Sequence, residues 1–431
     1  MSILNRLFGL EHHETTIRTE SVAGLTTFLA MAYITVVNPS MLSQAGMDFG
    51  AVFVATCIAA AFGTIVMGLY ANYPIAQAPG MAQNAFFTFG IVLGMGHSWQ
   101  TALGAVFLSG LIFIALSVLP VREWLINAIP RNLKLGMAAG IGLFLGFIAL
   151  KNAGIVVDHP ATLVALGDLV SFEPMACIAA FVAIAALSAR GNRAAVVIGI
   201  LLAAAAGWLS GNAQFLGFVA TPPSLAPVLM QLDIMAAFQW SMVTVVLSML
   251  IVDVFDTAGT LVGVATRAKL LDTDGHLPRL RKALLSDSTA TVVGAVAGTS
   301  STTSYIESAA GVEAGGRTGL TAVVCGLLFL LCLFFAPLAQ SVPPYATASA
   351  LLFVACLMAR SLADIDWDDI TESAPAVIAA LAVPLSFSIA DGIGLGFISY
   401  FLIKILSGKA HDCSIAVYVI AAVFAGKYFF L

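Results

Sequence analysis

Charged residues are scarce in this sequence of 431 residues, where Asp, Glu, Lys and Arg together make up only 10% of the chain. A soluble domain carries roughly 25% charged residues, because its surface faces water. The composition therefore excludes a soluble globular protein. Hydrophobic residues make up 60% of the sequence, and the apolar runs are too many and too long for a single anchor. We expect an all-α polytopic membrane protein with no nucleic-acid partner.

Motifs of enzymes and metal sites are also missing. The six cysteines form no CxxC pair and no cluster with histidine, and the six histidines fall in predicted loops or tails. The chain has no GxxxxGK[ST] loop, so it lacks an ATPase of its own. We therefore expect no catalytic residues, no metal and no cofactor. A membrane enzyme would need such a cluster, and a channel would show single-ion currents instead of saturable uptake.

The distribution of basic residues predicts the topology. We expect about fourteen transmembrane segments, after an N-terminal segment 1–19 in the cytoplasm. With that orientation, 16 of the 18 basic residues fall in cytoplasmic loops or ends, among them Arg122, and only Lys151 falls outside. Residues 413–430 are apolar enough to span, and the sequence leaves open whether they span or lie in the interface. The chain is expected in the plasma (inner) membrane.

Two segments interrupt this pattern at matched positions. The stretches 70–87 (YANYPIAQAPGMAQNAFF) and 297–311 (AGTSSTTSYIESAAG) each begin with small, polar or Pro/Gly residues and then turn apolar. Pro79-Gly80 breaks the chain, so a half-helix can start near Met81. The Ser/Thr run 299–304 favours extended backbone. We expect segments 3 and 10 to be broken half-helices preceded by short strands, in two inverted repeats of seven segments. The alternative is two small-residue stretches that only pack helices.

Three acidic residues fall well within membrane segments: Asp253, Asp256 and Glu307. A carboxylate at the bilayer centre costs roughly 2.5–3.5 kcal/mol, so these groups should face a polar cavity, hold a proton part of the time, or both. Asp253 and Asp256 are three apart on one helix and share a face. Glu307 should lie in the first turns of its half-helix. The alternative is that these groups only tie helices together, and it is strongest for Asp256.

Other polar and aromatic residues surround these acids in the sequence. Asn84 in the first half-helix offers a donor and an acceptor. Phe86, Phe87 and Tyr305 supply rings on which a flat ligand can stack. Carboxylates accept hydrogen bonds from N–H groups. The set predicts a site for a small, flat, neutral ligand rich in N–H donors, with a carboxylate that couples its movement to protons.

Five blocks of sequence resemble one family. They are 26–42 (TTFLAMAYITVVNPSML), 77–87 (QAPGMAQNAFF), 253–263 (DVFDTAGTLVG), 298–320 (GTSSTTSYIESAAGVEAGGRTGL) and 390–400 (ADGIGLGFISY). In collinear order they resemble the AzgA-like branch of the nucleobase:cation symporters, which are hypoxanthine/guanine/adenine permeases of the xanthine/uracil permease superfamily.

The resemblance implies a uracil-permease-like fold. Its core domain would comprise 20–120 and 237–337, and its gate domain 121–236 and 338–431. Members commonly form homodimers through the gate. The resemblance places substrate binding at Asn84, Asp253 and Glu307, proton coupling at Glu307 and Asp253, and a supporting role at Asp256. Ala82 stands where the family usually has Gly and Gln83 where it has an apolar residue; the methyl group of Ala82 narrows the approach to a ligand.

The sequence therefore predicts a proton-coupled symporter that imports purine bases by alternating access. Which of hypoxanthine, guanine and adenine is preferred stays open, as do the affinity and the proton stoichiometry. The alternative of the same fold is an anion transporter of the sulfate/bicarbonate type. That site would present an empty or basic half-helix terminus, whereas this chain carries Glu307 there.

Overall fold

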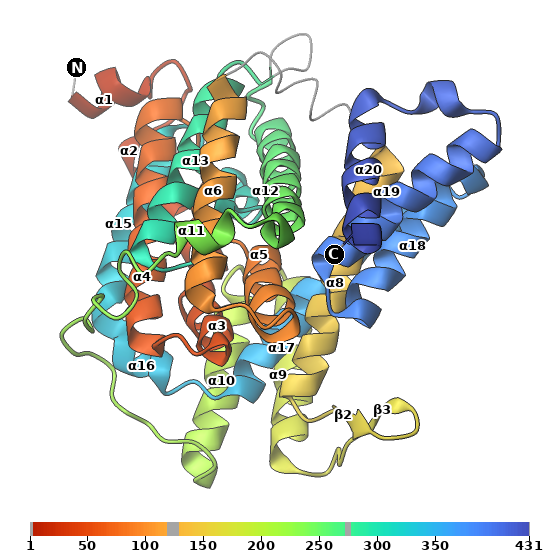
Figure 1. The fold of residues 1–431 in the computed structure, drawn as a ribbon. Helices are drawn as coiled ribbons and strands as arrows, with labels where there is room; N and C mark the ends of the chain where they lie inside the picture. Colours follow the sequence, from red (N-terminus) through yellow and green to blue (C-terminus); the bar gives the residue numbers. More distant parts are fainter. Residues whose placement is uncertain (1–2, 119–128, 272–276, 431) are drawn as a thin grey trace.

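The computed structural model describes residues 3–118, 129–271 and 277–430. These parts are mostly helical (Figure 1). Within them, nine helices are long and apolar enough to cross a membrane, which confirms the polytopic all-α prediction. They are Ile17–Ala45, Phe49–Ala71, Trp99–Val118, Arg131–Asn152, Phe172–Ala189, Trp240–Arg267, Gly319–Gln340, Pro344–Asp364 and Ile389–Leu406.

Shorter apolar helices accompany these nine in the same parts of the chain: Met81–Gly94, Ala195–Ser210, Ile370–Ser386 and Ile415–Tyr428. The total of about fourteen segments and the orientation of the N-terminus stay predictions. Arg122 and the predicted domain boundary between residues 120 and 121 lie outside the described residues.

One set of helices packs together on the left of Figure 1, and we call it the larger helix group. Its helices and strands are α2 (Ile17–Met31), α3 (Ile34–Leu42), α4 (Phe49–Val66) with its π-helical extension η2 (Met67–Ala71), β1 (Gln77–Pro79), α5 (Met81–Ala85) with the π-helical segment η3 (Phe86–Gly94), α6 (Trp99–Val118), α12 (Trp240–Arg267), α13 (Leu280–Ala297), β4 (Thr302–Ser304), α14 (Ser308–Glu313) and α15 (Gly319–Cys332). Small residues allow close crossings here: a Cβ on Gly319 would lie 1.9 Å from the carbonyl oxygen of Gly68.

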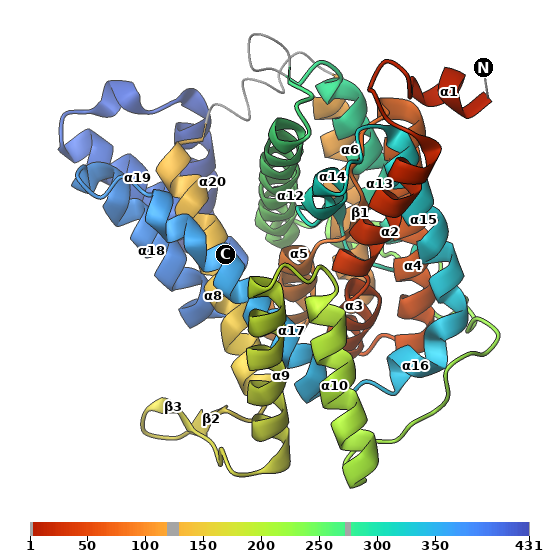
Figure 2. The same ribbon diagram turned by 180° about the vertical axis from the view of Figure 1, so that it is seen from behind.

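A second set of helices packs together as the smaller helix group: its blue C-terminal helices lie on the right of Figure 1 and on the left of Figure 2, and its yellow-green helices lie at the bottom of both views. It consists of α8 (Arg131–Asn152), α9 (Phe172–Ala189), α10 (Ala195–Ser210), α17 (Pro344–Ala359), α18 (Ile370–Ser386), α19 (Ile389–Leu406) and α20 (Ile415–Phe430). The remaining elements are connections: α1 (Ile3–Phe8), η1 (Ser43–Ala45), β2 (Val156–His159), β3 (Leu163–Leu166), α11 (Ile234–Ala237), η4 (Leu333–Phe335), α16 (Ala336–Gln340), η5 (Arg360–Asp364) and η6 (Ala410–Asp412).

Both predicted half-helices are present, each after a short strand. Strand β1 pairs with β4 in antiparallel register, Gln77 opposite Ser304 and Pro79 opposite Thr302. The backbone of Gln77 also exchanges hydrogen bonds with the Thr64 side chain, at 2.8 and 2.9 Å, so the outer edge of β1 is satisfied. Non-helical backbone is tolerated at membrane depth only where it is satisfied inside the protein. The two breaks therefore pair with each other in the middle of the larger helix group.

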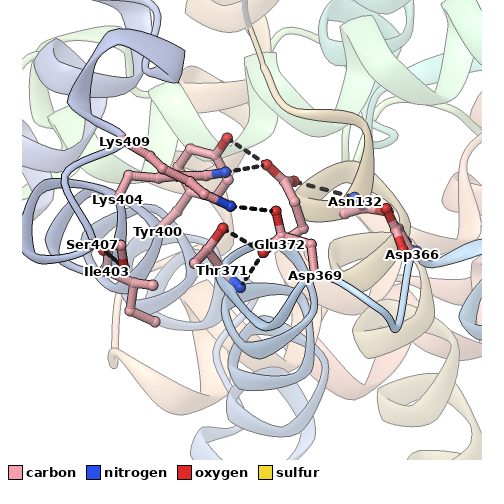
Figure 3. A network of polar contacts seen from close by, with 10 residues as sticks. All are labelled: Asn132, Asp366, Asp369, Thr371, Glu372, Tyr400, Ile403, Lys404, Ser407 and Lys409. Carbon is pink, nitrogen blue, oxygen red and sulfur yellow. Dashed lines mark hydrogen bonds and ion pairs between the residues drawn. The ribbon is translucent and has the colours of Figure 1, made fainter.

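A buried ion pair ties the smaller helix group together (Figure 3). Lys404 on α19 lies 2.7 Å from Glu372 on α18, and the Lys404 side chain is only 2% exposed. The Tyr400 hydroxyl and the Asn132 amide also donate to the Glu372 carboxylate, at 3.0 and 3.1 Å. Asn132 in turn accepts from the backbone N–H of Asp366 at 3.0 Å. One carboxylate thus joins α8, α18 and α19.

Candidate functional site

The two half-helices and α12 meet at a small space that we call the central cavity. It has a volume of about 120 Å³. The larger helix group contributes residues from the β1–α5 and β4–α14 segments and from α12, and α17 contributes an apolar wall. The lining residues are Gly80, Met81, Ala82, Asp256, Thr260, Thr303, Ser304, Tyr305, Ile306, Glu307, Val354, Leu357 and Met358. These lining residues include carboxylates and hydroxyls but no Lys, Arg or His.

Glu307 and Asp256 are the two acids that line the central cavity. Glu307 is the N-cap residue of α14, and Tyr33, in the turn between α2 and α3, donates a hydrogen bond to Glu307 Oε1 at 2.6 Å. Asp256 extends from the middle of α12, and its side chain is exposed to the space it lines. The cavity is therefore an anionic pocket between two carboxylates, and it suits a neutral ligand that donates from N–H groups.

Asp253 lies behind this cavity, one turn earlier on α12. It is fully buried, and its Oδ2 accepts from the Thr291 hydroxyl at 3.2 Å. Among the described residues its Oδ1 has no hydrogen-bond partner. A three-residue spacing separates two side chains by about 60° around a helix. Asp256 can therefore face the cavity while Asp253 faces α13.

The other predicted site residues also divide into those that line the central cavity and those that are buried away from it. Ala82 and Tyr305 line the central cavity, and the Tyr305 hydroxyl donates to the Pro79 carbonyl at 2.6 Å. Asn84 is buried behind the wall, where its Oδ1 accepts from the Ser300 hydroxyl. Phe86 and Phe87 are buried in the surrounding hydrophobic core. Of the three predicted aromatic residues, only Tyr305 lines the cavity.

A fourth buried acid, Asp287 on α13, belongs to this site and the sequence reasoning missed it. Its Oδ1 accepts from the Gln77 side-chain amide and from the Ser304 hydroxyl, each at 2.8 Å. Its Oδ2 accepts from the Thr257 hydroxyl at 2.7 Å. Asp287 therefore holds β1, β4 and α12 together just behind the cavity. Helix α13 begins at Leu280, within the charged start of this stretch, which places Asp287 two turns inside the helix.

Two further contacts were also missing from the sequence reasoning. Tyr33 gives no signal in the sequence, because its partner is 274 residues away. The backbone at Gly80 lies close to the Gln83 side chain. A Cβ on Gly80 would lie 2.2 Å from Gln83 Oε1 and 3.1 Å from the Thr303 methyl carbon. Any side chain at position 80 would displace the polar end of Gln83 from its place beside the cavity.

A larger space of about 610 Å³, which we call the vestibule, adjoins the central cavity between the two helix groups. It shares Ala82, Asp256, Thr260, Ile306, Leu357 and Met358 with the central cavity and adds residues of α8 and η5. Lys134 on α8 lines it, with its ammonium 4.8 Å from the centre of the Phe255 ring. The sequence suggested no basic residue near the buried acids, and the fold brings Lys134 into the same space as Asp256.

Comparison with known proteins adds three similarities. A family model described as a permease family (Xan_ur_permease) matches residues 18–395. Adenine permease AdeP of Escherichia coli (strain K12) is 48% identical over 429 residues, which cover 100% of this chain and 96% of that protein. Guanine/hypoxanthine permease PbuG of Bacillus subtilis (strain 168) is 46% identical over 443 residues, which cover 99% and 100%.

Among solved structures, the transmembrane domain of a cyanobacterium bicarbonate transporter, BicA, matches the fold. Its TM-score is 0.64 at 14% sequence identity, over 87% of this chain and 97% of that one. At this identity the likeness concerns the fold alone. It supports the two-group helical architecture and carries no information on what the central cavity binds.

Proposed function

Because this chain belongs to the permease family, it is a multi-pass membrane transporter of nucleobases, and we propose that it imports purine bases across the plasma membrane together with protons. It is a permease and not an enzyme. The observation that carries the proposal is the pair of carboxylates, Asp256 and Glu307, in one cavity whose lining residues include no basic side chain. The relatives named as adenine and guanine/hypoxanthine permeases support purines as the substrate class.

The recognition follows from the chemistry of the wall. A purine base is flat, and its N–H groups can donate to the carboxylates of Glu307 and Asp256. Met81 and Ala82 are the first two residues of their helix, and N–H groups there have no acceptor within the helix, so they can serve the ring nitrogens or carbonyl of the base. Tyr305 supplies an aromatic face. Leu357 and Met358 close the opposite side with apolar contacts.

Proton coupling follows from the free-energy cost of ionised carboxylates at membrane depth. Two carboxylates in a cavity whose lining residues include no basic side chain are expensive at membrane depth, and either a proton or a ligand N–H group relieves that cost. We propose that Glu307 or Asp256 takes up a proton when the base binds. Asp253, buried behind Asp256 with one oxygen unpaired among the described residues, is the second proton-holding group. A site that holds both a proton and a base carries less uncompensated negative charge while the two helix groups move relative to each other.

For alternating access, the larger helix group would act as the core domain and the smaller group as the gate domain. We place the N-terminus in the cytoplasm from the distribution of basic residues. The vestibule lies toward the start of α8, at the same end of the molecule as α1 (Figure 1). The structure then corresponds to an inward-facing state, in which Asp256 is reached from the cytoplasm. The homodimer through the gate domain, implied by the resemblance, is part of the same proposal.

Uptake into liposomes that contain the purified chain tests the substrate. Labelled adenine, guanine and hypoxanthine are offered with an inward proton gradient, and unlabelled xanthine and uracil are used as competitors. We expect saturable purine uptake that a protonophore abolishes. Glu307→Gln and Asp256→Asn should lose most uptake. Glu313→Gln is the matched control, because Glu313 lies on the same half-helix with its side chain 55% exposed.

The outcomes separate the alternatives. Uptake that a protonophore leaves unchanged rules out proton coupling. Wild-type rates in both Glu307→Gln and Asp256→Asn rule out the site. Uptake of sulfate or bicarbonate that purines do not inhibit favours the anion transporter. The two carboxylates in the cavity make that outcome the weaker one, because they repel an anion.

A further inference from the structure

Another cavity lies between the two helix groups; Tyr33 lines it, and it shares no lining residue with the central cavity. It has a volume of about 320 Å³ and we call it the apolar cavity. Its walls come from α2, α3, α4 and α15 of the larger helix group, from the connecting elements η4 and α16, and from α10 of the smaller helix group. Representative lining residues are Phe28, Tyr33, Ile200, Leu328, Leu331 and Phe335. It reaches toward α16, at the end of the molecule opposite α1 (Figure 1).

The chemistry of these walls excludes water as a stable occupant. Apart from the polar atoms of Tyr33, Thr35 and Cys332, the lining side chains are hydrocarbon. A buried water needs two to four polar partners, and the Tyr33 hydroxyl already donates to Glu307. Apolar cavities of this kind stay dry and bind apolar molecules. The walls therefore suit a hydrocarbon occupant.

The mouth of the apolar cavity opens onto the lipid-facing surface. Leu29, Leu201 and Leu331 line the cavity and remain 38%, 38% and 55% exposed. They continue into a belt of exposed leucines and phenylalanines on the same helices, which in a membrane-spanning chain contacts acyl chains. We propose that one hydrocarbon chain of a membrane lipid enters between α10 and α2 and fills this cavity.

The position of the cavity favours a lipid chain over a second copy of the protein. Its mouth lies among exposed leucines, which in a membrane-spanning chain contact acyl chains. An acyl chain is thin and flexible enough to enter, and each buried CH2 group contributes about 0.8 kcal/mol.

The lipid chain would act on the site through Tyr33. Tyr33 lines the apolar cavity, and its hydroxyl donates a hydrogen bond to Glu307 at 2.6 Å. A chain packed against the ring fixes the position of the hydroxyl, and it also fills the gap between the two helix groups. This consequence for transport rests on the proposed function, whereas the binding of the lipid chain does not.

Photolabelling of the full-length protein in liposomes tests the binding. The liposomes contain a trace phospholipid with a diazirine in the middle of one acyl chain, and the adducts are mapped by peptide mass spectrometry. We expect adducts concentrated on residues 28–36 and 197–201. Ile200→Trp places a large ring in the cavity and should reduce these adducts several-fold, and Ile200→Phe serves if the tryptophan variant does not fold.

Leu202→Trp is the matched control, because Leu202 lies on the same helix, is 53% exposed and is absent from the cavity wall. It should leave the adducts at wild-type yield. Uniform labelling of all lipid-facing helices, or undiminished labelling in both Ile200 variants, overturns the proposal. The labelling experiment uses no purine. A negative labelling result therefore does not contradict the purine proposal, and absent purine uptake does not contradict lipid binding.

Discussion

The hydroxyl of Tyr33 donates a hydrogen bond to Glu307 at 2.6 Å, across 274 residues of sequence. This contact joins the turn between α2 and α3 to the N-terminus of the second half-helix, α14. It orients one of the two carboxylates that face the central cavity. It also places the Tyr33 ring on the wall of the apolar cavity. Tyr33 is therefore the structural link between the substrate site and the surface where the two helix groups meet.

Removal of the Tyr33 hydroxyl should weaken substrate binding. A hydrogen bond to a charged group contributes about 1.5–3 kcal/mol, and about 1.4 kcal/mol corresponds to a factor of ten. We expect Tyr33→Phe to raise the KM for purine uptake roughly tenfold or more. Tyr418→Phe, which removes a 3.3 Å hydrogen bond to Ala410 far from the cavity, is the control. An unchanged KM in Tyr33→Phe would show that the hydroxyl does not orient Glu307 for binding.

Asp287 should matter for stability as well as for transport. Its carboxylate accepts three hydrogen bonds, from Gln77, Ser304 and Thr257. Asp287→Ala leaves these donors unpaired, at a cost of about 1–3 kcal/mol for each buried group left unsatisfied. We expect a clearly lower Tm in detergent, and a smaller decrease for Asp287→Asn, which keeps one acceptor oxygen. Asp158→Ala, on the exposed hairpin strand β2, is the control and should melt like the wild type.

The network in Figure 3 predicts a non-additive pair of substitutions. Lys404→Met leaves Glu372 without its buried cation, and breaking a buried pair costs about 3–5 kcal/mol. Replacing both residues by methionine removes the uncompensated charge, so the double variant should melt higher than Lys404→Met alone. The Tm values of Lys404→Met, Glu372→Met and the double variant together give the coupling between the two residues. Additive decreases in Tm would mean that the pair does not act as a unit.

Asp369 at the N-terminus of α18 predicts a pH dependence outside the membrane. Hydrogen bonds from the Lys409 ammonium at 2.9 Å and from Thr371 hold the pKa of the Asp369 carboxyl below its usual range. A group with a lowered pKa stabilises the fold above its unfolded pKa of about 3.9, and this stabilisation is lost as the pH falls through the folded value. The Tm difference between wild type and Asp369→Asn should therefore be constant above about pH 5 and shrink below about pH 4. A difference that grows on acidification would contradict this assignment.

The breaks in the half-helices could be predicted because their signals are local. Pro79 removes a backbone donor, and the Ser/Thr run 299–304 competes for backbone hydrogen bonds. The helix does begin at Met81, and strands β1 and β4 do precede the half-helices. The scarcity of acids within apolar segments likewise singled out Asp253, Asp256 and Glu307. Asp256 and Glu307 line the cavity, whereas Asp253, an expected substrate ligand, is buried outside it.

The remaining contacts depend on tertiary packing, which local patterns do not encode. Asp287 follows the charged start of α13, so its burial appears only when α13 packs against α4 and α6. The partners of Tyr33 and Lys134 come from other helices. The different surroundings of Asp253 and Asp256 depend on the rotation of α12 about its axis.

The most direct test of the central claim is purine-driven proton entry. Liposomes that contain the wild-type chain and a trapped pH-sensitive dye, with equal pH inside and outside, receive external adenine or hypoxanthine. We predict acidification of the interior in the wild type, at a rate that follows purine uptake, and none in Glu307→Gln or Asp256→Asn. Purine uptake without acidification, or acidification that persists in both variants, would contradict the assignment of proton and purine to these two carboxylates.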